Sequence, residues 1–175
     1  MVVKLIIGTA FFRRSSVEEI EQTEAFSKYA WFFLIIEAVI IFLSTYFGPG
    51  TGLNPPLNEV IQESFWAFTT TLILYFSIAI IGNILGGETS FGEILRVMGF
   101  TVPITWIIAL IFYLLPDLMI IWILFILYLI AVTIYVLMVA IGKGAFTAII
   151  SVFVAVIITI ILSSLLFYAL TLIVT

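Results

Sequence analysis

Residues 118–141 read LMIIWILFILYLIAVTIYVLMVAI and contain no charged side chain. A helix needs roughly 20 predominantly apolar residues to cross the hydrocarbon of a bilayer, so this run is long enough to do so. Its apolar residues are continuous and do not alternate with polar ones, which argues against a strand of a membrane barrel. The stretch therefore predicts a transmembrane helix.

Four further apolar runs of similar length occupy about 29–47, 64–85, 97–115 and 145–172. Only Pro116-Asp117 separates the third span from the fourth, and only Gly142-Lys143-Gly144 separates the fourth from the fifth. Both connections predict tight helical hairpins. We therefore predict an all-α integral membrane protein, with a cytoplasmic segment and short helix over 1–28 and a five-helix transmembrane domain over 29–175.

The composition supports a membrane class and excludes several kinds of chemistry. Apolar residues make up 65% and charged residues 9% of the chain, against about 45–50% and about 25% in soluble domains. The chain has no His and no Cys, which excludes His-based metal sites, Ser-His and Cys-His nucleophiles, and disulfides. A net charge of −4 argues against nucleic acid as a partner. We expect no enzymatic activity and no cofactor.

The basic residues predict how the chain is oriented in the membrane. With five spans, every Lys and Arg falls on one side, and acidic residues alone fall on the other. The positive-inside rule then places the N-terminus in the cytoplasm and the C-terminus outside. The basic side carries Lys4, Arg13, Arg14, Lys28, Arg96 and Lys143, and the opposite side carries Glu59, Glu63 and Asp117.

The first 28 residues divide into an apolar and a polar part. The run up to Phe12 resembles a signal-peptide core in length, but Arg13-Arg14 follows it without a cleavage site, so we expect a segment at the membrane interface. Residues 16–28 predict a short polar helix, with Ser16 and Glu19 as a capping box, or Ser15 and Glu18 one residue earlier. This helix is either a solvated lead into the first span or a docking surface.

The connection between the second and third spans is rich in signals. Gly86-Gly87 is typical of a helix end, and Ser90 with Glu93 predicts a capping box for a helix that begins at the interface. Gly82 and Gly86 also form a G-x-x-x-G pair, which would let a neighbouring helix approach closely. Pro103 lies inside the third span and predicts a kink there.

Glu37 is the one ionisable side chain well inside a span. A charged residue at the bilayer centre costs about 2.5–3.5 kcal/mol on insertion scales. No basic residue lies at that depth, so we expect a neutral, protonated carboxyl that is hydrogen-bonded to Thr, Ser, Tyr or backbone. Two interpretations stay open, namely polar packing between helices and a proton or cation site.

Residues 85–103, LGGETSFGEILRVMGFTVP, resemble the signature of the Yip (Ypt/Rab-interacting protein) domain family. That signature has a double glycine, a Ser-Phe pair, a short helix containing Leu-Arg, and a Gly-aromatic pair leading to proline. The Phe11-Phe12 pair, five spans and a small-residue turn before the last span also match. The candidate functional or structural residues are therefore Glu37, Gly86, Gly87, Ser90, Phe91, Glu93, Arg96, Gly99 and Pro103.

The resemblance implies a multi-pass membrane protein without catalytic activity, with its N-terminus inside and its C-terminus outside. Eukaryotic members act in traffic between endoplasmic reticulum and Golgi, bind prenylated Rab GTPases and associate with related membrane proteins. They usually carry a long cytosolic N-terminal region, whereas about 28 residues precede the first span here. We therefore expect a prokaryotic type of member in the cell membrane, for which binding of a small GTPase rests on the family analogy alone; a eukaryotic one would lie in the endoplasmic reticulum or Golgi membrane.

Two function classes follow. The first is a non-enzymatic membrane scaffold or trafficking-type organiser, whose partners are the lipid bilayer and other membrane proteins or a second copy of the chain. The second is a small transporter or channel subunit that uses the buried Glu37.

Overall fold

The computed structural model describes residues 1–47, 56–114 and 119–174. Two short helices, α1 (Val2–Ala10) and α2 (Arg14–Gln22), and a 3-10 turn (Glu24–Phe26) precede the long helices. Five long helices follow. They are α3 (Ser27–Phe47), α4 (Leu57–Ile84), α5 (Phe91–Leu114), α6 (Met119–Ile141) and α7 (Ala145–Val174).

Within the described ranges, all five long helices are long and apolar enough to cross a membrane. They coincide with the five predicted spans, so the all-α, five-span prediction is confirmed. Two helices begin earlier than the apolar runs alone indicated, because α4 starts at Leu57 and α5 at Phe91. Their first turns carry Glu59 and Glu93, which suit the positive end of a helix dipole.

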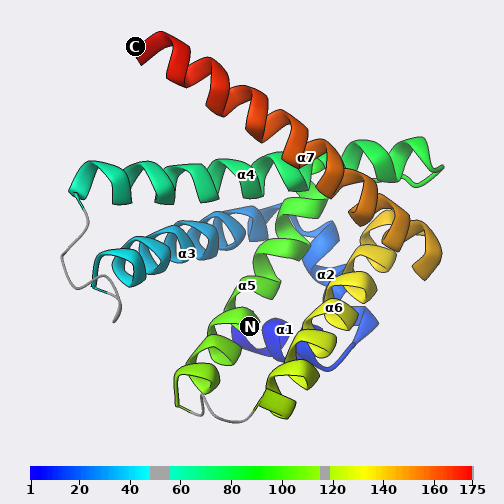
Figure 1. Cartoon of the computed structure of the whole chain (residues 1–175). Helices are drawn as coiled ribbons and strands as arrows, with labels where there is room; N and C mark the ends of the chain where they lie inside the picture. The colour runs from blue at the N-terminus through cyan, green and yellow to red at the C-terminus, as the bar shows by residue number, and fades with distance from the viewer. Residues whose placement is uncertain (48–55, 115–118, 175) are drawn as a thin grey trace.

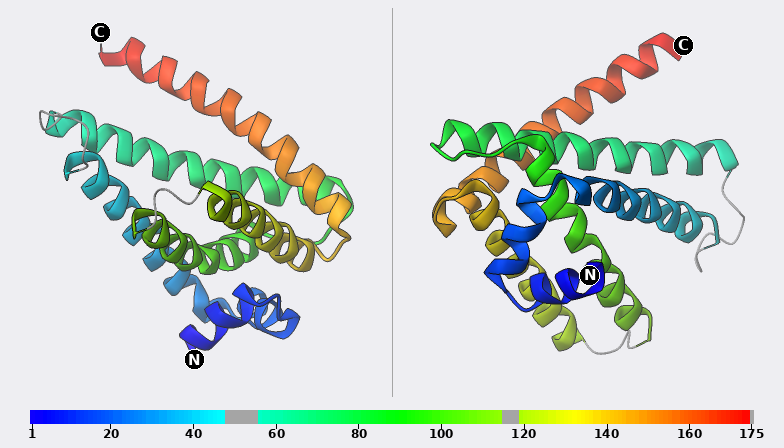
Figure 2. Two further views of the ribbon diagram at one scale, coloured as in Figure 1. Left: turned by 60° about the horizontal axis from the view of Figure 1, so that its bottom comes forward. Right: turned by 180° about the vertical axis from the view of Figure 1, so that it is seen from behind.

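The long helices are splayed rather than parallel. α4 lies between α3 and α7, and α7 diverges from α4 toward the C-terminus (Figure 1). α5 and α6 pack against each other and run in a different direction from α4 (Figure 2). The N-terminal hairpin of α1 and α2 and the end of α7 lie at opposite ends of the molecule (Figure 2). The α4–α5 connection and the α6–α7 turn meet at one end of the molecule, where Gly87 lies against Ile141.

α5 is the central helix of this arrangement. It packs against α3, α4, α6 and the two N-terminal helices, and residues 94–104 are all buried. The aromatic ring of Phe100 is fully buried and meets Phe26 and Phe33 edge-on. The second half of the 85–103 segment therefore lies in the core of the fold.

The N-terminal segment folds as a helical hairpin, α1–α2, that packs on α5 and α6. The Tyr128 hydroxyl of α6 donates a 2.6 Å hydrogen bond to the Ala10 carbonyl at the end of α1. Phe12, in the turn, meets the rings of Tyr128 and Tyr135 edge-on, while Phe11 is 73% exposed. Residues 1–12 are thus tied to the helix bundle along with α2.

The predicted capping boxes at Ser15 and Ser16 are wrong. α2 begins at Arg14, and no side chain caps it. The Arg13 N–H instead donates to the Gly8 carbonyl at 2.8 Å, and Ser16 packs so closely on Gly8 that a β-carbon there would collide with its hydroxyl. Ser16, which the local sequence predicted as the cap of α2, is therefore used in the packing of α2 on α1. The helix predicted over 16–28 also divides into α2, the 3-10 turn and the start of α3.

One of the two predicted helical hairpins lies within the described residues and is confirmed. α6 ends at Ile141 and α7 begins at Ala145, with Gly142 at a φ of +68°. The Gly142 N–H donates to Val139 and the Lys143 N–H to Met138, which is a Schellman ending. The hairpin at Pro116-Asp117 and most of the loop over 48–56 lie outside the described residues.

Candidate functional site

The predicted helix stop at Gly86-Gly87 has the geometry that glycine favours. Gly86 adopts a φ of +85°, a left-handed conformation that costs other residues strain. The Gly86 N–H donates to the Asn83 carbonyl at 3.0 Å, and the Gly87 N–H to the Gly82 carbonyl at 2.9 Å. This Schellman motif satisfies carbonyl groups at the end of α4 and turns the chain toward α5.

Gly82 and Gly87 let the end of α4 approach the end of α6. A β-carbon on Gly87 would lie 2.7 Å from the Ile141 carbonyl oxygen, and one on Gly82 would lie 3.2 Å from the Ile141 side chain. A β-carbon on Gly86 would have open space. Of the G-x-x-x-G pair, Gly82 therefore makes the close helix contact, and Gly86 makes the turn.

Two polar clamps hold the short connection between Leu85 and Phe91. The Asn83 side chain donates to the Thr89 carbonyl at 2.7 Å and accepts from the Thr89 N–H at 2.8 Å. The Ser90 N–H donates to the Glu93 carboxylate at 2.6 Å, and the Glu93 N–H donates to the Ser90 hydroxyl at 3.2 Å. The second pair is the predicted capping box, so α5 starts where the sequence placed it.

Arg96, in the second turn of α5, is buried with a 7% exposed side chain. Its Nε donates to the Glu21 carbonyl oxygen at 2.9 Å, Nη2 donates to the same oxygen, and Nη1 donates to the Ser27 hydroxyl at 3.3 Å. No ion pair to Arg96 occurs in the part of the chain that the structure describes. The guanidinium thus fastens α2 and the start of α3 onto α5.

Glu21, whose carbonyl binds Arg96, also carries an ionisable side chain near Glu18 and Glu93. Glu21 is half-buried, and burial, followed by the negative charges of Glu93 and Glu18, raises the pKa of its carboxyl to about 7; the positive charge of Arg96 acts in the opposite direction. Glu21 therefore changes charge near neutral pH. Phe91, the remaining residue of the Ser-Phe pair, is half-buried and meets the ring of Phe76 on α4 edge-on at 6.1 Å.

Gly99 marks the crossing of α5 and α3. A β-carbon on Gly99 would lie 2.7 Å from the Ala30 β-carbon and 2.8 Å from its α-carbon, so no larger residue fits. Pro103 follows one turn later and has no N–H for the Gly99 carbonyl, yet α5 continues through it to Leu114. Beside this position, the Thr101 hydroxyl donates to the Met98 carbonyl at 2.6 Å.

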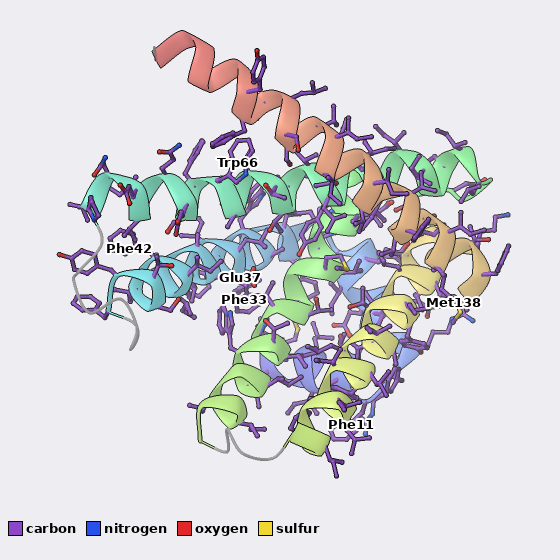
Figure 3. The ribbon with its side chains drawn as sticks, viewed as in Figure 1. Phe11, Phe33, Glu37, Phe42, Trp66 and Met138 are labelled. Atoms are coloured by element: carbon purple, nitrogen blue, oxygen red, sulfur yellow. The ribbon has the colours of Figure 1, made fainter. Side chains whose placement is uncertain are left out.

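Glu37 lies apart from these residues, near the middle of α3 and facing α4 (Figure 3). Its half-buried side chain borders a cavity of about 10 Å³, room for about one water molecule. Among the described residues, its carboxyl makes none of the hydrogen bonds that the sequence led us to expect. The nearby Thr71 hydroxyl donates instead to the Ala67 carbonyl of its own helix at 3.0 Å, while Tyr75 is close enough to interact electrostatically with Glu37.

The structure thus joins the predicted residues of the Yip-like segment into one structural unit and leaves Glu37 outside it. Several partners were not predicted: Asn83, Ile141, Ala30 and Glu21, each of which a motif residue contacts. Asn83 carried a usable signal, because an amide three residues before a double glycine suits a loop clamp. The others are contacts between distant helices, for which the sequence carries no local signal.

Comparison of the chain with family models, curated proteins and solved structures finds no match. Fold and composition nevertheless define the class of protein. Five long apolar helices, with large apolar side chains such as Phe65, Phe153 and Ile160 on the outer surface, make this a multi-pass membrane protein.

Proposed function

We propose that the chain is a non-enzymatic membrane scaffold or organiser of the Yip type, which acts through contacts with other proteins. The observation that carries this proposal is the use of Arg96. In an enzyme or a phosphate site, such a buried guanidinium would face a ligand, but here its donors bind the Glu21 carbonyl and the Ser27 hydroxyl. The Yip-like segment therefore serves to hold the α1–α2 hairpin in place.

The surface held in this way suits a protein partner. Glu19 on α2 and Glu24 at the start of the 3-10 turn are exposed, and Phe11 is exposed in the α1–α2 turn. A fixed surface that carries charges of both signs, with Arg13 and Arg14 beside the exposed ring of Phe11, offers both electrostatic steering and an apolar anchor. The proposed partners are other membrane proteins or a second copy of the chain; binding of a small GTPase stays a prediction of the family resemblance.

Photo-crosslinking in the native membrane tests this function. A photoreactive amino acid at position 19 is expected to give a discrete adduct with a partner. The same group at position 59, exposed at the start of α4 and far from the hairpin, is the matched control and is expected to give none. An equal set of adducts from both positions, or none from position 19, would contradict a scaffold that works through the hairpin.

The proposed orientation places the α1–α2 hairpin and the α6–α7 turn in the cytoplasm. The native chain has no Cys, so a single cysteine at position 143 reports the side of the membrane without background. In sealed cells, we expect an impermeant thiol reagent to label it only after permeabilisation, whereas a cysteine at position 59 is labelled from outside. Labelling of position 143 in intact cells would reverse the proposed orientation.

A transporter or channel subunit is the second candidate, favoured by Glu37. Its carboxyl borders a cavity between α3 and α4 with room for about one water molecule and makes no hydrogen bond among the described residues. Buried carboxyls in membrane helices mark proton or ion paths in many proteins. The scaffold is preferred because, in the part of the chain that the structure describes, no second acidic or basic side chain lines this cavity.

A further inference from the structure

A second polar feature lies on the opposite side of α4 from α3. Between α4 and α7 runs a groove of about 450 Å³, within the size range of ligand pockets. α4 contributes Glu63, Trp66 and Thr70, and α7 contributes Thr159 and Ser163. In Figure 3, Trp66 points from α4 into the space before α7, where the two helices diverge.

The hydroxyl groups of this groove are incompletely satisfied. Thr159 is only 5% exposed. Among the described residues, its hydroxyl oxygen Oγ1 has no hydrogen-bond partner. The Thr70 and Ser163 hydroxyls share one long contact of 3.5 Å. A buried hydroxyl without a partner is costly, and more so between membrane helices, where water is scarce. A polar group that gained access to these hydroxyls would satisfy them.

The chemistry of the groove favours a hydrogen-bond donor with positive charge. Glu63 contributes a carboxylate, and the hydroxyl oxygens of Thr70, Thr159, Ser163 and Ser164 offer lone pairs. Trp66 offers an aromatic face, which meets Phe167 edge-on at 5.7 Å. A primary ammonium has three donors and no acceptor, so it matches these acceptors and the ring. An anionic group would meet the Glu63 carboxylate and no basic side chain among the described residues that line the groove, so only the cationic end of a headgroup suits it.

We propose that the α4–α7 groove binds the primary ammonium of a membrane lipid headgroup, as in an ethanolamine phospholipid. The groove is open along its length, and exposed apolar side chains flank it, including Ile160 within it and Leu166 one turn beyond Ser163. Acyl chains would pack on this apolar surface while the ammonium enters between the hydroxyls. The proposal does not depend on the scaffold function.

Lipid-dependent thermal unfolding of the full-length protein in detergent tests this site. We expect ethanolamine phospholipid to raise Tm in a saturable way and choline phospholipid, whose ammonium has no N–H, to do so much less. Thr159→Val keeps the shape of the side chain and removes its hydroxyl, and Glu63→Gln removes the charge. Each is expected to weaken the apparent affinity for ethanolamine lipid about tenfold or more.

Glu59→Gln is the matched control, because Glu59 is exposed on the same helix one turn before Glu63 and outside the groove. It is expected to keep the wild-type affinity. Equal stabilisation by ethanolamine and choline lipids, or unchanged affinity in both Thr159→Val and Glu63→Gln, would overturn the proposal. Equal stabilisation by free ethanolamine, titrated without lipid, would assign the groove to a soluble amine and overturn a lipid site.

Discussion

The guanidinium of Arg96 donates hydrogen bonds to the backbone carbonyl of Glu21, and so joins the second turn of α5 to the end of α2. The Glu21 carbonyl is part of the backbone of α2, so it cannot move away from the guanidinium unless the helix moves with it. Buried guanidinium donors at such a site are worth more than an exposed ion pair. Arg96 therefore helps to fix the position of the N-terminal hairpin, together with the Tyr128–Ala10 hydrogen bond and the packing of Phe12.

Arg96→Gln is expected to destabilise the protein by about 1.5–3 kcal/mol, because hydrogen bonds to a charged group are lost and the Glu21 carbonyl is left without its donor. Thermal unfolding in detergent measures the loss, and limited proteolysis near Phe12 reports release of the hairpin. Arg14→Gln is the control, since Arg14 is exposed and pairs only with Glu18 on its own helix. An Arg96→Gln protein as stable and as protease-resistant as Arg14→Gln would remove Arg96 from this role.

Gly99→Ala is expected to cost about 1–3 kcal/mol, because the new methyl group would overlap Ala30 and force α3 and α5 apart. Gly144→Ala is the matched control, because a β-carbon there meets open space. The double variant Ala30→Gly with Gly99→Ala should recover part of the loss, and comparison of the four Tm values measures the coupling. Additive effects in the double variant would show that the two residues do not touch.

The carboxyl of Glu21 predicts a pH dependence of stability. Its folded-state pKa is raised to about 7, so the folded protein binds this proton more tightly than the unfolded chain does. The stability it contributes is therefore full below the unfolded value of about 4.3 and is lost as pH rises through about 7.

Glu21→Gln is expected to remove this part of the pH dependence and to be more stable than wild type at pH 8. The measurement is Tm from pH 4.5 to 8.5 for wild type, Glu21→Gln and the exposed control Glu24→Gln, which should follow the wild-type profile. If wild type and Glu21→Gln ran parallel across that range, the raised pKa of Glu21 would be refuted.

Features encoded in local sequence could be predicted. The five spans follow from apolar runs, the stop at Gly86 from the conformational freedom of glycine, and the start of α5 from Ser90 and Glu93. The same capping pattern failed at Ser16, where the side chain packs on Gly8 instead. One motif thus succeeded in an exposed connection and failed where two helices meet, because tertiary contacts override local preference.

Features that depend on distant contacts could not be predicted. The sequence shows that residue 99 is glycine, but no feature of the sequence predicts that Ala30 packs against it. Arg96 was expected on the basic side of the membrane, yet its partner is a backbone carbonyl, which has no sequence signature. The hydroxyls of Thr159 and Ser163 belong to an apolar span, and only the approach of α4 turns them into a polar groove.

The most direct test of the central claim, that this chain works through contacts and not by transport, is proton flux in liposomes. Purified protein is reconstituted with a pH-sensitive dye inside, and a pH step is applied across the membrane. We expect wild type and Glu37→Gln to dissipate the gradient no faster than protein-free vesicles, because among the described residues no second acidic or basic side chain lines the Glu37 cavity. Rapid dissipation by wild type that disappears in Glu37→Gln would contradict the scaffold and establish a transporter.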